Sequence, residues 1–273
     1  METTKLSQKK IFCFLLLTLT ISAVFYGSMI STGAAGRGGA AWMWSPGQAA
    51  ILTQLLFRGK LGDFGWRPGE VRYLLIGYVT PWLYGLIIYL TVWVTGWGGF
   101  QARSIAIGEF RLPFILSLLA QATLLFVPAC LAALGEEIGW RGLLVPELAK
   151  FTTFTRVALL TGVVWALWHY PAMLFADYRS QVPLWFQLPV FTISVLGMSV
   201  FTAWLRLKSR SLWPAVLWHG NHNLLIQGLF LNMTTEAGFT EYIVDDFGIG
   251  VLLASLVMGY AFWRKGTALT VGG

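Results

Sequence analysis

The chain has 273 residues, of which 56% are hydrophobic, 15% aromatic and only 11% charged, and its formal net charge is +7 at pH 7. A soluble domain carries roughly 25% charged residues, so this composition excludes a globular protein with a fully water-exposed surface. The basic residues are spread between apolar segments and form no single patch, which argues against a nucleic-acid partner.

Apolar segments close to the length of a membrane span follow one another along the chain. A helix needs roughly 20 predominantly apolar residues to cross the hydrocarbon core of a bilayer. The pattern therefore predicts an all-α, polytopic membrane protein in which residues 1–273 form a single integral membrane domain. About eight transmembrane helices are expected, at 11–30, 40–57, 73–96, 114–134, 154–175, 187–205, 212–231 and 247–263.

The first apolar segment allows two interpretations. A basic start, an apolar stretch and the following STGAAG are typical of a cleaved signal peptide. The apolar stretch is long for a signal peptide, so a retained helix is favoured, and cleavage would leave the remaining topology unchanged.

The distribution of basic residues predicts the orientation. If the N-terminus is cytoplasmic and the spans alternate, fifteen of the 19 basic residues lie in cytoplasmic segments, and only Arg37, Arg103, Arg111 and Arg179 lie on the other side. Basic residues concentrate in cytoplasmic loops of membrane proteins. We therefore expect a multi-pass protein of the cell membrane with both termini in the cytoplasm.

Three charged residues stand at the end of the fourth apolar segment, in the sequence GEEIGWRGLL at 135–144. Neighbouring residues on a helix point about 100° apart, so Glu136 and Glu137 cannot share one role. Arg141 follows Glu137 by four residues, and this spacing predicts an ion pair across one helical turn. Glu136 has no such partner and is a candidate general base. Alternatively, the three charges only mark the cytoplasmic end of this span.

Two histidine stretches lie on later spans. In VVWALWHYP at 163–171, His169 stands about halfway along a span, and Trp165 shares its helix face. In LWHGNHNLL at 217–225, His219 and Asn223 are four residues apart, so both can donate hydrogen bonds to one oxygen atom, as in an oxyanion site. His222 lies between them and either assists the site or packs in the core.

The same His219 and Asn223 pair could bind a metal ion. Asparagine is a poor zinc ligand, and HxxxN differs from the HExxH zinc motif, so no resident metal or other cofactor is expected. A divalent metal such as zinc, if present, would be held by Glu136, His169 and His219.

The three polar stretches fall on three different spans and all lie toward the cytoplasmic half of the predicted topology. Ionisable residues at membrane depth are costly and usually functional. A transporter with a proton relay would also use them, but no inverted repeat supports it. The convergence instead predicts a functional site within the membrane.

The ordered motifs EEIGWR at 136–141, WALWH at 165–169 and HGNHN at 219–223 resemble those of the CPBP family of intramembrane proteases. That family includes the type II CAAX prenyl endopeptidases and the bacteriocin-immunity (Abi) proteins. The second motif begins with Trp where the family usually has Phe. The resemblance covers about residues 110–230, which it marks as the catalytic core.

The resemblance implies a function and residue roles, with a hydrolytic site in a conical intramembrane cavity that opens toward the cytoplasm. Glu136 with His169 would position and activate the attacking water, His219 and Asn223 would stabilise the oxyanion, and Glu137, Arg141 and Trp165 would support the site. The expected activity is intramembrane endoproteolysis, as in CAAX processing, of a membrane-anchored or lipidated peptide or protein, including a prenylated one. A non-proteolytic immunity factor or scaffold of the same family is the alternative.

Overall fold

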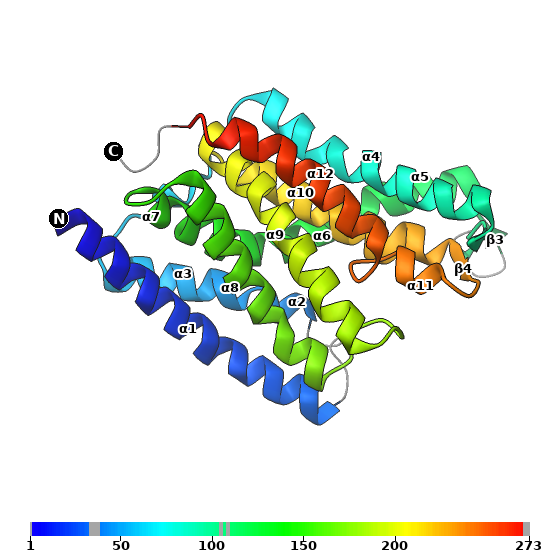
Figure 1. Ribbon diagram of the computed structural model, residues 1–273, viewed down its shortest axis with the longest axis horizontal. Helices are drawn as coiled ribbons and strands as arrows, with labels where there is room; N and C mark the ends of the chain where they lie inside the picture. The colour runs from blue at the N-terminus through cyan, green and yellow to red at the C-terminus, as the bar shows by residue number, and fades with distance from the viewer. Residues whose placement is uncertain (1, 33–38, 104–105, 108–109, 270–273) are drawn as a thin grey trace.

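The helices of the chain pack into one bundle, shown by the computed structural model for residues 2–32, 39–103, 106–107 and 110–269 (Figure 1). Helix α9 packs against α8 and α12, α10 packs against α4 and α6, and α1 packs against α3. The start of α1 and the end of α12 lie at the same end of the bundle, opposite β3 (Phe110–Arg111), β4 (Thr234–Glu236) and α11 (Figure 1). The helices are α1 (Glu2–Thr32), α2 (Gly39–Trp42), α3 (Ser45–Leu56), η1 (Leu61–Phe64), α4 (Val71–Thr95), α5 (Phe114–Leu124), α6 (Phe126–Glu137), η2 (Ile138–Leu144), α7 (Val145–Ala149), α8 (Phe154–Phe175), α9 (Leu184–Ser209), α10 (Trp213–His222), η3 (Asn223–Phe230), α11 (Thr240–Ile243) and α12 (Ile249–Gly266).

Five helical stretches within the described residues are long and apolar enough to cross a membrane. They are Glu2–Thr32, Val71–Thr95, Phe114–Ala149, Phe154–Phe175 and Leu184–Ser209. The prediction of an all-α polytopic membrane protein is confirmed.

The expected number of eight spans is not confirmed. The predicted span 40–57 is divided between α2 and α3, and α3 has only 12 residues. At 1.5 Å per residue such a helix is about 18 Å long, which is shorter than a hydrocarbon core of about 30 Å. The last two predicted spans correspond to the continuous α10 and η3 and to α12.

Short strands join segments at the end of the bundle far from the termini. β1 (Gly98–Phe100) pairs antiparallel with β4 (Thr234–Glu236), and β2 (Ala106–Ile107) pairs antiparallel with β3 (Phe110–Arg111). The first pairing places Gly99 opposite Thr235 and ties the segment after α4 to the segment after η3.

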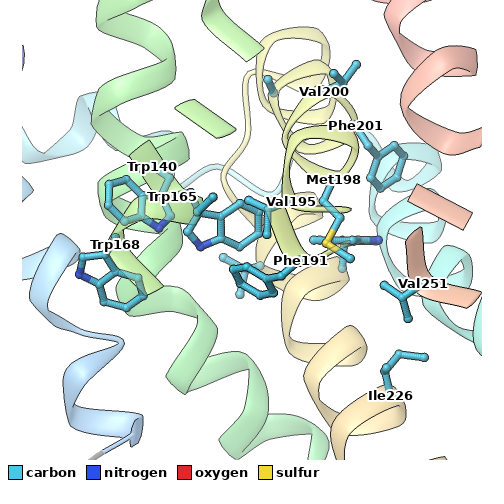
Figure 2. Packing of buried hydrophobic residues seen from close by; sticks show 14 of the residues in the cluster. Trp140, Trp165, Trp168, Phe191, Val195, Met198, Val200, Phe201, Ile226 and Val251 are labelled. Atoms are coloured by element: carbon cyan, nitrogen blue, oxygen red, sulfur yellow. The ribbon is translucent and has the colours of Figure 1, made fainter. Parts of the chain in front are cut away.

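Tryptophan side chains fill much of the core near the polar motifs. Trp140, Trp165 and Trp168 form one group, and Phe191 and Met198 of α9 lie on the side of Trp165 that is away from Trp168 (Figure 2). All five side chains are buried. The polar motifs are therefore enclosed by bulky aromatic and apolar groups that exclude lipid and bulk water from them.

The helix geometry changes at two of the three polar motifs. Residues Ile138–Leu144 and Asn223–Phe230 are π-helical and continue α6 and α10 without a break. A π-helical turn inserts an extra residue per turn and often occurs at functional sites. Here the first π-segment follows Glu137 directly, and the second begins at Asn223.

Candidate active site

Glu136 stands in the last turn of α6 with 1% of its surface exposed. Its Oε2 atom accepts hydrogen bonds from two indoles, Trp165 Nε1 at 2.6 Å and Trp140 Nε1 at 3.1 Å. Its Oε1 atom faces His219 Nε2 at 4.0 Å. One carboxylate oxygen is thus fixed by tryptophans, and the other is directed toward a histidine.

Glu137 forms the buried ion pair that its spacing from Arg141 predicts. Arg141 donates to Glu137 Oε1 at 2.7 Å, and both side chains are fully buried. Arg141 also donates to Thr202 on α9 at 2.5 Å, and its guanidinium lies 4.2 Å from the centre of the Trp165 ring. Buried charges need such partners because their desolvation costs several kcal/mol per ion. Glu137 Oε2 and Arg141 Nε are buried without a hydrogen-bond partner among the described residues.

His219 links the two glutamates. Its Nδ1 atom donates to Glu137 Oε1 at 2.9 Å, because a carboxylate can only accept, and its Nε2 atom is the one that faces Glu136. When His219 is neutral, this arrangement leaves Nε2 as an acceptor. When His219 is an imidazolium, Nε2 becomes a donor, and the two carboxylates supply its countercharge.

His169 is oriented by its own helix. Its Nδ1 atom lies 2.8 Å from the carbonyl oxygen of Trp165, so Nδ1 carries the proton and donates it. A neutral His169 then keeps the lone pair of Nε2 free to accept a proton. Its ring stacks on Tyr178 and meets Phe191 edge to face.

One cavity brings together all four residues predicted to be catalytic. Its volume of about 60 Å³ has room for roughly four water molecules, at about 15 Å³ for each. Its polar lining consists of Glu136, His169, Tyr178, Ser194, His219, His222, Asn223, Gln227 and Asp246. Of the supporting residues, Trp165 lines the cavity, whereas Glu137 and Arg141 lie behind His219 and Trp165.

His222 has both ring nitrogens occupied. The Tyr84 hydroxyl donates to Nδ1, and Nε2 donates to Asp246 Oδ1 at 2.7 Å. Its ring also stacks on Trp218. His222 is therefore a member of a buried hydrogen-bonded network and has no free nitrogen with which to act on a substrate.

Asp246 lines the same cavity and was missed by the sequence analysis. It lies between α11 and α12, in the segment TTEAGFTEYIVDD, which is rich in acids and resembles an exposed loop. The structure buries it to 6% exposure. Its position directly before an apolar segment was the only signal in the sequence, and many exposed loops share that signal.

Among the described residues, no group of three or more His, Cys, Asp or Glu side chains has a geometry that could hold a metal ion. Glu136 Oε2 and His219 Nδ1 are already engaged by indole and carboxylate partners. Glu136, His169 and His219 share the cavity but are not arranged as a set of metal ligands.

The comparisons with known proteins bear on this arrangement. The family model for Rce1-like type II CAAX prenyl endopeptidases matches residues 118–225, a segment that contains all three motifs. Over these residues the chain is similar to this Rce1-like family. The resemblance to CPBP-family proteases is thereby confirmed.

The chain is also similar to a curated protein that is named as a CAAX prenyl protease. The CAAX prenyl protease 2 of Methanococcus maripaludis is 29% identical over 144 residues, which is 50% of each chain. The chain thus spans about half the length of this relative in the alignment. Asp246 and Gln227 lie outside the segment that the Rce1-like family model matches.

Proposed function

We propose that this Rce1-like chain is an endopeptidase that hydrolyses a peptide bond of a membrane-associated substrate by means of water activated by Glu136. The observation that carries the proposal is one cavity that Glu136 lines together with His169, His219 and Asn223. In it, Glu136 Oε1 is directed toward His219 Nε2. Peptide hydrolysis needs a proton acceptor for water and donors for the developing oxyanion, and this set of side chains supplies both.

In the first step, Glu136 Oε1 accepts a proton from a water molecule as the water oxygen attacks the peptide carbonyl carbon. The lone pair of His169 Nε2 provides a second acceptor that orients the same water. The carbonyl π bond becomes an oxyanion on a tetrahedral carbon. When the carbon–nitrogen bond breaks, the proton held by Glu136 passes to the departing amine.

In this proposal the oxyanion receives hydrogen bonds from the imidazolium of His219 and from the amide of Asn223. His219 must be doubly protonated for this role because its Nδ1 proton is used by Glu137. Removal of one oxyanion donor from a protease costs roughly 100- to 1,000-fold in rate. Glu137 and Arg141 act through His219, since they fix the direction of its ring.

The substrate class follows from the membrane setting and the family. The related archaeal protein is named as a CAAX prenyl protease. A prenylated peptide anchored in the bilayer would present its cleavage site close to a cavity enclosed by membrane helices. We therefore propose a lipid-anchored peptide, with a prenylated cysteine as the first candidate.

The test compares wild type with Glu136→Gln in lipid vesicles that contain a farnesylated peptide with an internally quenched fluorophore. We expect Glu136→Gln to lower cleavage at least 1,000-fold, since it removes the proton acceptor. Glu147→Gln is the matched control, because Glu147 is also buried but pairs with Lys10 and Lys150 outside the cavity.

Cleavage by Glu136→Gln at the wild-type rate would contradict the glutamate mechanism. If wild type and all variants fail to cleave every membrane peptide offered, while Glu136→Ala and His169→Ala keep the cellular phenotype, the alternative of a non-proteolytic immunity factor or scaffold would hold.

A further inference from the structure

A second hydrogen-bonded network closes the cavity through Asp246. Asp246 Oδ1 accepts from His222 Nε2 at 2.7 Å, and Oδ2 accepts from Gln227 Nε2 at 2.6 Å and from the Tyr178 hydroxyl at 3.3 Å. All four of these side chains line the cavity that Glu136 also lines. The connection before α12 is thereby bonded directly to the helix that carries Asn223.

The network determines how the Gln227 amide is turned. Burial raises the pKa of the Asp246 carboxyl, but hydrogen bonds from His222 and Gln227 hold it below its usual value. An ionised carboxylate only accepts hydrogen bonds, so the NH₂ group of Gln227 must face Asp246. The orientation of this amide therefore follows from its partner.

The orientation of the Gln227 amide in turn determines that of the Asn223 amide, one turn earlier on η3. The Gln227 Nε2 atom lies 3.5 Å from Asn223 Oδ1 and carries a second N–H group that can point to it. The oxygen of the Asn223 amide is thus on the Gln227 side, which leaves the Asn223 NH₂ group free to donate elsewhere. A donor is what an oxyanion site requires of Asn223.

We propose that Asp246 and Gln227 are positioning residues that hold the Asn223 amide with its NH₂ group available to the oxyanion. This inference rests on the proposed function of Asn223. It extends the site to Gln227 and Asp246, which lie beyond the segment matched by the family model. Residues 219, 223 and 227 are spaced by four along one continuous helical stretch, which carries the histidine donor, the amide donor and its orienting amide.

The first test is Asp246→Asn, which offers an NH₂ group to Gln227 and lets the Gln227 amide turn over. We expect kcat on the farnesylated peptide to fall about 10- to 100-fold with KM within twofold, as for other losses of a group that orients a functional residue. Gln227→Met, which keeps the length of the side chain but removes its hydrogen bonds, should act in the same direction.

Asp245→Asn is the matched control. Asp245 is the adjacent aspartate and its Oδ1 atom is buried, but it does not line the cavity. Its backbone has φ of 65°, a conformation that asparagine tolerates well. We expect kcat within twofold of wild type, whereas a loss equal to that of Asp246→Asn would show that replacing either aspartate in this connection lowers kcat and would overturn the inference.

A double-mutant cycle separates positioning from general stability. In an Asn223→Ala background, the Asp246→Asn change should lower kcat less than twofold further, because the group that it positions is already absent. The same further loss as in the wild-type background would overturn the inference. Wild-type cleavage that depends on Glu136 but not on Asp246 would also overturn it and leave the proposed function intact.

Hydrogen–deuterium exchange gives a readout that needs no cleavage. In the full-length protein in nanodiscs, Asp246→Asn should speed exchange of the peptides covering residues 176–183 and 240–248, since both segments are held through Asp246, while Asp245→Asn should not. Unchanged exchange in Asp246→Asn would overturn the inference even if no peptide substrate is cleaved.

Discussion

At the scale of single residues, the carboxylate of Glu136 has two unequal oxygens. Oε2 is held by the indoles of Trp140 and Trp165, whereas Oε1 faces the cavity and His219. This asymmetry prevents rotation of the carboxylate and keeps one oxygen in place to accept a proton. Tryptophan suits this task, because it has a single N–H donor on a large apolar ring that also excludes water.

Replacement of Trp165 tests this reading of the carboxylate. Trp165→Phe keeps a ring over Arg141 but removes the 2.6 Å bond to Glu136, and a hydrogen bond to a charged group contributes about 1.5–3 kcal/mol. We expect kcat on the farnesylated peptide to fall at least tenfold. Trp93→Phe, which removes an indole bond to Thr234 away from the cavity, should change kcat less than twofold. Equal losses in the two variants would contradict the proposed role.

The residue scale also shows what the sequence alone could predict. The polar stretches could be found because charged and histidine side chains are costly at membrane depth. The Glu137–Arg141 pair could be predicted because it is local to one helical turn. The bond between His219 and Glu137 could not, since 82 residues separate them and only packing of α10 on α6 brings them together.

At the scale of elements, α3 is a short helix that packs closely on α6, the helix that carries Glu136. A Cβ atom on Gly47 would lie 2.5 Å from the carbonyl oxygen of Gly135, and one on Gly139 would meet Pro46 at 2.5 Å. Hydropathy predicts a span over 40–57, because α3 and its flanks are apolar. In the structure the leucines at 52, 55 and 56 are exposed, whereas small residues such as Gly47 are buried against the neighbouring helices. A pattern of hydrophobicity does not show that this helix ends after 12 residues.

This close approach yields a prediction for α3. Gly47→Ala inserts a methyl group against backbone, which cannot move aside as a flexible side chain would, so we expect α3 to shift and Glu136 to move with α6. The midpoint of thermal unfolding in detergent should fall by several degrees, with cleavage reduced at least tenfold. Gly27→Ala is the control, because nothing lies within 4 Å of its added Cβ atom. An unchanged midpoint in Gly47→Ala would contradict the tight packing.

At the scale of the whole molecule, the two ends of the helical bundle differ in the charges that they carry. The two termini lie at one end of the bundle, and β3, β4 and α11 lie at the other (Figure 1). The first end carries Lys5, Lys9 and Lys10 near the N-terminus and Arg264 and Lys265 at the end of α12. Residues 234–248, which precede α12, carry acids and no base. From the positive-inside rule we predict that the end with the termini faces the cytoplasm.

Cysteine labelling in intact cells tests this orientation. Cys13 and Cys130 are first replaced by serine, and single cysteines are introduced at the exposed positions Gly62, Glu236 and Ala268. A membrane-impermeant maleimide added outside should label Glu236→Cys at once. It should label Gly62→Cys and Ala268→Cys only after the membrane is permeabilised, because the basic segments keep both on the cytoplasmic side.

The labelling pattern also decides which face of the membrane supplies the substrate. The EEIGWR motif is followed by α7 and Lys150, close in sequence to the basic residue Arg156, and so belongs to the half of the bundle that the charge distribution places toward the cytoplasm. A lipid-anchored substrate would then reach Glu136 from the cytoplasmic leaflet. If Gly62→Cys and Ala268→Cys are instead labelled in intact cells while Glu236→Cys is protected, the orientation is reversed and the substrate must be sought outside the cell.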